Sequence, residues 1–322
     1  MVTSFHALIS RILNIPVGQV ERTIGLLGEG ATIPFISRYR KEVTGGLDEV
    51  QIGNIKDQLD KLTELKKRKE SILSSIEEQG KLTPELKKRI EDSWDNTEIE
   101  DLYLPYKPKR ITKAEIARKK GLEPLARIVM MQNERDLPAR VAAFIKGEVK
   151  NAEEALQGAR DIIAEWVNEN EEARNVVRNS FSHTAVITSK VIKGKEEEGA
   201  KYLDYFSETL NRISSHRLLA LRRGETEGIL RVSISPDTTG CLDRLKRRFV
   251  KGRGETSDQV SIAVDDSFKR LLKPSIETEF ANLSKAKADE EAIRVFTENL
   301  RQLLLAPPLG QKRVLGVDPG YR

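Results

Sequence analysis

Residues 28–49 read GEGATIPFISRYRKEVTGGLDE, a short apolar and then basic segment framed by glycines. Thr32 is a suitable N-cap for a new helical turn, because its hydroxyl can accept from a free backbone N–H. Gly45-Gly46 predicts a tight turn before Asp48, which is placed to cap a long helix. The segment therefore predicts a basic connection between helices, and its first basic tract is a candidate binding surface: Arg38, Arg40 and Lys41.

Composition favours an extended helical protein. Charged residues make up 33% of the 322 residues and aromatic residues only 5%, which suits helices better than a β-sandwich. A chain of this length predicts two or three subdomains. The net charge is +5, from 55 basic and 50 acidic residues, so an overall charge surplus does not by itself demand a nucleic-acid partner.

The chain carries no sign of secretion or of membrane insertion. Cys241 is the single cysteine, which excludes an intrachain disulfide. Residues 1–13 lack the pattern of a signal peptide, and no run approaches the roughly 18 apolar residues that a membrane span needs. We therefore expect a cytoplasmic protein without a membrane partner.

Asp48 to Gly80 reads as one long helix. Its apolar seam is Ile52, Ile55, Leu59 and Leu62, and its expected polar face is Lys61, Lys66, Lys67, Arg68 and Lys69. A coiled-coil dimer is one reading of the seam. Because lysines interrupt it, packing within the same chain is the preferred reading.

Short helices then follow one another, and the pattern changes near Phe181. Residues 186–192 are rich in β-branched residues, and residues 230–235 alternate apolar with polar, so both read as strands. Residues 215–223 between them read as helix. Helix resumes at residues 239–250 and 257–272, Pro274 is expected to break or kink it, and Val314–Val317 is expected to open a strand. The expected fold is mostly α, a multi-helical array with a small mixed α/β insert.

Two further tracts are rich in basic residues. The second tract, Lys107 to Lys120, contains Lys109 and Arg110 and follows Tyr103 and Tyr106, an arrangement that can stack bases and hold a backbone. The third tract is the densest, and its members are Arg244, Lys246, Arg247, Arg248, Lys251 and Arg253. Such clusters suit sequence-tolerant contacts with phosphates. The alternative for the first tract is that its cations pair with Glu42, Asp48 and Glu49 or clamp the helix junction. For the second tract it is that Tyr103 belongs to a local apolar contact, and for the third it is a solvated helix end that complements the helix dipole.

Catalytic and metal chemistry find little support. His6, His183 and His216 are isolated, and Cys241 has no thiol neighbour, so no zinc spacing exists. His216, beside Arg217, is the better functional histidine. Asp318 ends an apolar run and is the one catalytic suspect, but two-metal hydrolysis needs several converging carboxylates. We expect no enzyme activity, no metal and no cofactor.

Several motifs resemble the Tex family of bacterial transcription accessory proteins. They are residues 28–52, RISSHR at 212–217 with RRGE at 222–225, LLLAPPLG at 303–310 and LGVDPGYR at 315–322. The resemblance covers the whole chain but only part of a Tex protein. It implies a helix-turn-helix-like N-terminal region, and it implies that the family continues into an RNase H-like domain, helix-hairpin-helix elements and an OB-fold RNA-binding domain. The chain is thus expected to be an N-terminal fragment.

The resemblance also gives expected parts and an expected role. The parts are residues 1–180, the helical region with the helix-turn-helix-like part; 181–236, the mixed insert; 237–310, helical; and 311–322, the first strand of a truncated RNase H-like domain. In the family that domain is regarded as catalytically incomplete. The implied role is a nucleic-acid-binding scaffold of the transcription machinery, taking RNA or DNA without sequence preference, with RNA polymerase as a further candidate partner. The alternative is a protein-interaction scaffold that binds nucleic acid negligibly.

Overall fold

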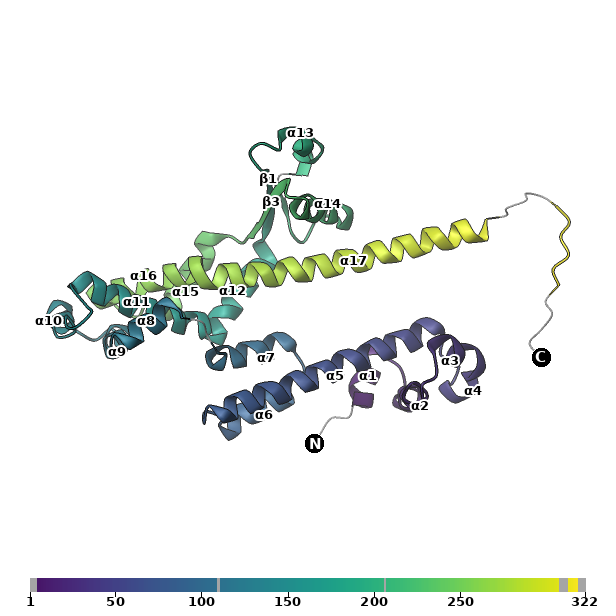
Figure 1. Cartoon of the computed structure of the whole chain (residues 1–322), viewed down its shortest axis with the longest axis horizontal. Helices are drawn as coiled ribbons and strands as arrows, with labels where there is room; N and C mark the ends of the chain where they lie inside the picture. Colours follow the sequence, from purple (N-terminus) through teal and green to yellow (C-terminus); the bar gives the residue numbers. More distant parts are fainter. Residues whose placement is uncertain (1–4, 109–110, 206, 307–311, 318–322) are drawn as a thin grey trace. The chain divides into compact units, whose positions relative to one another are not determined.

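The protein is built mostly of helices arranged in two compact units, Met1–Arg110 and Ile111–Arg322 (Figure 1). The computed structural model describes residues 5–108, 111–205, 207–306 and 312–317. The mostly α fold with a small mixed insert is confirmed. The predicted first part, residues 1–180, extends across the boundary between the units, and the four-part division stays a prediction.

The first unit is organised along one long helix. Its elements are α1 (Phe5–Leu13), α2 (Val17–Gly28), α3 (Ile33–Tyr39), α4 (Lys41–Thr44), α5 (Glu49–Glu78), α6 (Pro84–Asp92), α7 (Asn96–Tyr103) and a 3₁₀ turn, Leu104–Tyr106. Asp48 caps α5 as predicted: its carboxylate accepts from the backbone N–H of Gln51 at 2.7 Å, and the Gln51 side chain accepts from the Asp48 N–H at 3.0 Å. This reciprocal pair satisfies two N–H groups at the helix start.

The apolar seam of α5 is covered by its own chain. Ile52, Ile55 and Leu62 are buried in a cluster with residues of α1, α2 and α3, and Leu59 packs against it. Farther along α5, Ile72 and Ile76 are buried with residues of α6 and α7. Packing within the chain, rather than the coiled-coil dimer, therefore accounts for the seam.

Lys69 corrects the predicted polar face of α5. Its side chain is buried, its Nζ donates to the Glu91 carbonyl at 2.9 Å, and it lies 3.8 Å from the centre of the Trp94 ring. Burial lowers the pKa of this amine, and the nearby carboxylates Asp92 and Glu91 oppose that effect. The predicted polar face of α5 was wrong at Lys69 because α6 and α7 pack over this part of the helix. The sequence pattern of α5 alone does not reveal that contact.

The second unit is larger and contains a sheet. Its elements are α8 (Lys113–Lys119), α9 (Glu123–Met131), α10 (Leu137–Ala142), α11 (Ala152–Glu169), α12 (Glu171–Thr184), β1 (Val186–Val191), α13 (Glu196–Gly199), a 3₁₀ turn (Ala200–Tyr205), β2 (Ser207–Thr209), α14 (Ser215–Thr226), β3 (Leu230–Ser235), α15 (Thr238–Phe249), α16 (Glu255–Ser267), a π-helical turn (Phe268–Leu272) and α17 (Lys273–Leu305). Helix α11 lies at its centre and packs against α8, α9 and α16.

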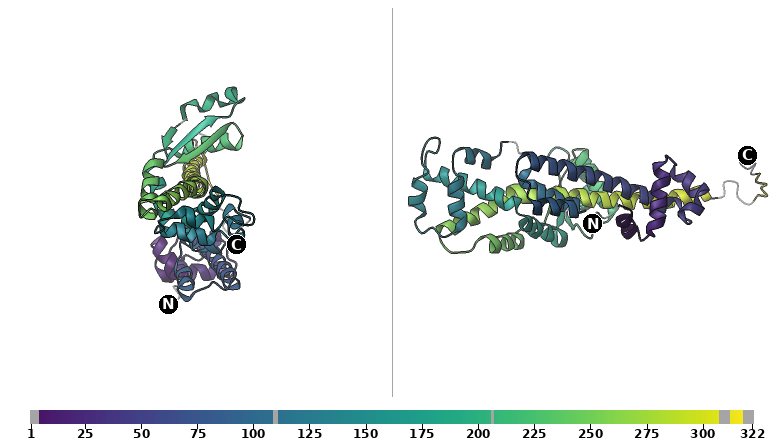
Figure 2. Two further views of the ribbon diagram at one scale, coloured as in Figure 1. Left: turned by 90° about the vertical axis from the view of Figure 1, so that its left-hand side faces the viewer. Right: turned by 90° about the horizontal axis from the view of Figure 1, so that it is seen from below.

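The predicted mixed insert is present as an antiparallel sheet of order β2-β1-β3 with helix α14. Strand β1 pairs with β3 from Val186 opposite Ser235 to Val191 opposite Leu230, and with the three-residue β2 on its other edge. Figure 2, left, looks along α17 and shows the sheet beside that helix. Strands β1 and β3 and helix α14 confirm the sequence prediction, whereas β2 is too short to carry a period-2 signal.

The helical rod continues through Pro274, so the predicted break is wrong, whereas the predicted kink stays a prediction. A π-helical turn precedes it, and the Lys273 N–H donates to the Phe268 carbonyl across this turn. Pro274 then falls in the first turn of α17, where a missing N–H is tolerated. At the other end of α17, residues 312–317 form neither helix nor strand, so the predicted strand at Val314–Val317 stays a prediction.

Among the described residues, no helix combines the length and the apolar composition needed to cross a membrane.

Two glycines of the first unit should respond to alanine in opposite directions. Gly45 has a φ of +72°, and an added Cβ would lie 2.4 Å from the Gln19 Nε2, so Gly45→Ala should lower the free energy of unfolding by about 1–2 kcal/mol. Gly53, inside α5, has open space around it, so Gly53→Ala should raise stability by about 0.5–1 kcal/mol. Urea unfolding monitored by circular dichroism checks both, and equal effects of the two changes would contradict the assignment.

Candidate nucleic-acid interface

The first basic tract lies on two short helices whose orientation is fixed by burial. The Thr32 hydroxyl accepts from the Phe35 N–H and caps α3, as predicted. Ile36 and Ser37 face the interior, which turns Arg38 outward; Arg40, between the helices, and Lys41, at the start of α4, are exposed as well. The three predicted cations are thus brought together on one connection between α3 and α4.

Helix α2 holds this connection in place. Gln19 Nε2 donates to the Gly45 carbonyl at 3.2 Å, and Arg22 Nε donates to the Val43 carbonyl. Both bonds satisfy carbonyls at the end of α4, which has no further helix to supply donors. The backbone that carries the cations of the first tract is therefore held by hydrogen bonds from α2.

The cations of the first tract have no carboxylate partner. Within the described ranges, Arg38, Arg40 and Lys41 make no ion pair, and the Asp48 carboxylate is occupied as the cap of α5. Arg40 instead lies with its Cζ 5.8 Å from the centre of the Phe35 ring. A cation over an aromatic face keeps its charge available to a third group. The local pairing offered as the alternative for this tract is not what the structure shows.

The second tract is divided by the boundary between the units, and Lys109 and Arg110 lie outside the described residues. Its tyrosines belong to the core of the first unit. Tyr103 is buried with its hydroxyl 3.1 Å from the Ser75 Oγ, and Tyr106 packs against the same cluster. These two rings are therefore not a base-stacking surface.

The second tract also supplies cations to two carboxylates of α11. Arg118 Nη1 lies 2.7 Å from the carboxylate of Glu165, a buried residue of α11 whose other oxygen accepts from Thr112 at 3.1 Å. Burial lowers the pKa of Arg118, but the hydrogen bond and charge of Glu165 raise it, with a net rise. Lys120 Nζ lies 2.6 Å from Glu154. Both cations hold α8 against α11.

The third tract contains two kinds of cation. Some form ion pairs with neighbouring helices, and others are exposed on α15 without such a pair among the described residues. Lys246 Nζ lies 2.8 Å from Asp265 on α16, and Arg248 pairs with Glu172 on α12. Arg244 and Arg247, one turn apart, are exposed and make no ion pair within the described chain; Arg244 Nε donates to the Gly240 carbonyl at 3.2 Å. Only part of the third tract therefore presents positive charge that no carboxylate of the described chain pairs.

The end of α15 is fixed by a glutamine. Gln132 Nε2 donates to the Phe249 carbonyl at 2.8 Å, and its Oε1 accepts from the Lys251 N–H at 2.9 Å. One amide therefore replaces the helical bonds that end at Phe249. It positions Lys251, which is exposed and, among the described residues, unpaired, next to the last turn of α15.

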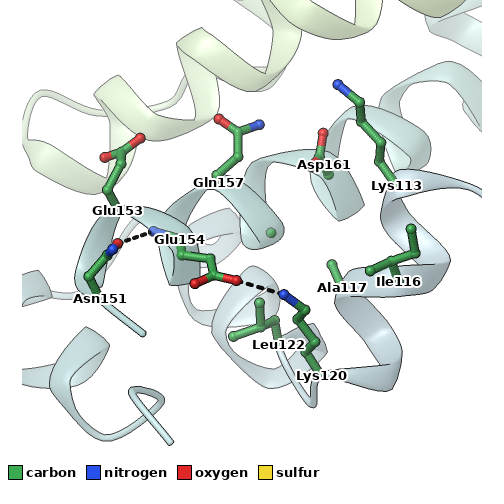
Figure 3. Close-up of a pocket in the computed structure, with 11 residues that line it drawn as sticks. Lys113, Ile116, Ala117, Lys120, Leu122, Asn151, Glu153, Glu154, Gln157 and Asp161 are labelled. Carbon is green, nitrogen blue, oxygen red and sulfur yellow. Dashed lines mark hydrogen bonds and ion pairs between the residues drawn. The ribbon is translucent and has the colours of Figure 1, made fainter. Parts of the chain in front are cut away.

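The hollows of the second unit are lined by charged groups that pair with one another. A hollow of about 430 Å³ lies between α8 and α11, and Figure 3 shows Glu154 bonded to Lys120 across it. Its Asp161 carboxylate pairs with Arg270 of the π-helical turn. His216 lines another hollow between α14 and α17, where Ser215 donates to Glu291. In the described parts of the chain, no three His, Cys, Asp or Glu residues gather as a metal would require, and Asp318 lies outside those parts.

Two aromatic residues beside the first tract, Phe35 and Tyr39, were given no role by the sequence analysis. Phe35 and Tyr39 are 42% and 54% exposed, and their ring centres are 5.5 Å apart. The available signal was their spacing of four residues on a short helix, which places them on the same side. That spacing is equally typical of core residues, so only the burial of Ile36 shows which side faces outward.

Arg118 and its neighbour Lys119 should differ in their contribution to stability. Arg118→Met leaves the Glu165 carboxylate buried without its cation and should cost about 2–3 kcal/mol, since a broken buried pair is expensive. Lys119→Met on the same helix changes an exposed side chain and should stay within about 0.5 kcal/mol. Denaturant titration of both variants checks this, and a neutral Arg118→Met would show that the pair is not structural.

Two models of known protein families match this chain. Residues 3–77 match the model of the Tex-like protein N-terminal domain, and residues 132–296 match that of the Tex central region. The first tract thus lies within the N-terminal match and the third within the central match.

Curated relatives are similar over almost the whole chain. The transcriptional accessory protein Tex of Neisseria gonorrhoeae is 41% identical over 325 residues, covering 98% of this chain and 43% of the relative. Protein YhgF of Escherichia coli is 39% identical over 338 residues, covering 100% and 44%. The human S1 RNA-binding domain-containing protein 1 is 29% identical over 332 residues, covering 98% and 33%. The chain spans less than half the length of these relatives. On these matches, the chain belongs to the Tex family.

Proposed function

We propose that this chain is a non-catalytic, sequence-tolerant nucleic-acid-binding part of a transcription accessory factor. The observation that carries the proposal is the exposed, unpaired state of Arg38, Arg40 and Lys41 on a fastened backbone, within the described residues. Other members of the basic tracts are paired with carboxylates, as Arg118 and Lys246 are. Cations kept without partners are available to phosphates, which guanidinium groups bind bidentately.

The third tract adds a second phosphate-binding surface. Arg244 and Arg247 project from α15, and Lys251 follows at its end. Contacts of this kind carry no sequence information, because phosphates are the same at every nucleotide. Both RNA and DNA are therefore proposed ligands. The names of the relatives, one a transcriptional accessory protein and one containing an S1 RNA-binding domain, support a role in transcription and a contact with RNA. RNA polymerase as a partner and a cytoplasmic location are further parts of the proposal.

The helix-turn-helix-like part and the RNase H-like continuation remain proposals of the same kind. Helices α1 to α4 occupy the region of the first, and residues 312–317 fall in the second. We propose no chemistry for this chain, because its clustered charged groups are engaged with one another or suited to phosphate contacts.

One observation favours a second candidate function, a protein-interaction scaffold. The last four turns of α17 expose apolar side chains on a helix that leaves the rest of its unit: Ile293, Phe296, Leu300, Leu303 and Leu304 (Figure 1). A contiguous exposed apolar surface marks an interaction site more often than chance. RNA polymerase, or further domains of a longer protein, are the partners proposed for it.

Salt-dependent binding separates the two candidates. Fluorescence anisotropy of labelled 12-nucleotide single strands and of duplexes should show binding that weakens steeply between about 50 and 200 mM salt, because each phosphate contact releases counterions. The charge reversals Arg38→Glu/Arg40→Glu and Arg244→Glu/Arg247→Glu should each weaken binding at least about tenfold and flatten the salt slope by roughly 1–2.

The matched control is Lys87→Glu/Lys88→Glu on α6, which changes the net charge equally at two exposed lysines outside the tracts. It should weaken binding much less than either reversal. Absence of binding at low salt, or equal losses for all three double variants, would overturn the proposal and favour the protein scaffold.

A further inference from the structure

The two aromatic rings of α3, Phe35 and Tyr39, are not among the described residues that form the apolar cluster of the first unit. Ile36 is fully buried and Ile33 packs against the same cluster, so these residues fix which side of α3 faces inward. Phe35 and Tyr39 therefore project outward, at 42% and 54% exposure. Single exposed apolar side chains are common. Two aromatic rings on a seven-residue helix form a surface of their own.

The geometry of the rings leaves one outer face open. Their centres are 5.5 Å apart with planes inclined by 41°, the spacing of two aromatic rings in direct contact, so no base fits between them. Arg40 lies over Phe35 at 5.8 Å. Tyr39 is the more exposed ring and has no cation over it among the described residues.

The charges around Tyr39 favour a polyanion. Residues 38–42 carry three positive charges and one negative charge, Glu42, and none of the three cations is paired within the described chain. Arg38 and Arg40 are the direct neighbours of Tyr39 in the sequence. A base stacked on this ring would thus have cations available for the phosphates before and after it.

We propose that this surface is a stacking site for single-stranded nucleic acid, in which an unpaired base packs on the outer face of Tyr39 while Arg38, Arg40 and Lys41 contact the flanking phosphates. The inference rests on the proposed function and adds to it a preference for single strands. A duplex offers the same phosphates but keeps its bases stacked inside, whereas each base stacked on an aromatic ring contributes about 1–3 kcal/mol.

An abasic oligonucleotide tests the inference directly. The 322-residue chain is titrated against a 12-nucleotide dT strand and against the matching abasic strand, which has the same phosphates and no bases. The unaltered chain should bind the dT strand about tenfold more tightly. Tyr39→Ala should remove most of this difference and leave abasic binding unchanged, whereas Tyr39→Phe should retain it because the ring remains.

A second readout does not depend on affinity. In Tyr39→Trp, the dT strand should quench the new tryptophan fluorescence on binding, and the abasic strand should not, with the unaltered chain correcting for Trp94 and Trp166. Urea unfolding confirms that each variant is folded.

The outcomes separate the inference from the proposed function. If both strands bind equally and Tyr39→Ala matches Tyr39→Phe, the contact is made through phosphates alone, and the stacking site is wrong although nucleic-acid binding stands. If neither strand binds even at low salt, both proposals fail, and the aromatic pair is left as a surface for a protein.

Discussion

The second unit depends on one constraint, which is that charges buried on α11 must be paired. Helix α11 is surrounded by other helices, yet it buries Arg160, Asp161 and Glu165. A buried charge without a partner costs several kcal/mol, so each must be met by an opposite charge or a hydrogen-bonding group, and Arg160 is met in part by Glu153 of α11 itself. Arg118 of α8 and Arg270 of the π-helical turn meet the two carboxylates, and the Gln259 side chain of α16 accepts from Arg160. The positions of α8 and α16 follow from these pairs together with the apolar contacts of the core.

This constraint explains why a chain that is close to charge balance has many basic residues. Cations that form an ion pair with a carboxylate contribute to the fold. Lys246 is one of them, although in the sequence it belongs to a tract that resembles a binding surface. Within the tracts, the cations without a carboxylate partner in the described chain are the candidates for contacts with other molecules. On α15 these are Arg244 and Arg247, and between α3 and α4 they are Arg38 and its neighbours, all within the described residues. Pairing therefore removes members such as Lys246 from the candidate interface, and exposed lysines outside the tracts, such as Lys87 and Lys88, provide the comparison.

The sequence predicted what depends on local chemistry and missed what depends on tertiary contacts. The cap at Asp48, the long helix α5 and the strands β1 and β3 follow from capping residues and apolar periodicity, and all were confirmed. Lys69 was misplaced because a helix distant in the sequence covers it, and the π-helical turn before Pro274 has no pattern of its own. The candidate site was predicted in the same way: its cations were named from composition, whereas their partners, and the outward direction of Tyr39, required the fold.

Ultraviolet crosslinking of the chain to a uniformly labelled single strand, with the crosslinked peptides identified by mass spectrometry, tests the central claim most directly. We expect crosslinks in two places, the α3–α4 segment around Tyr39 and the end of α15 around Lys251, and we expect them to be lost at high salt. Crosslinks spread evenly over exposed lysines, or confined to segments outside both tracts, would contradict it and would show that the unpaired cations of these helices do not mark the interface.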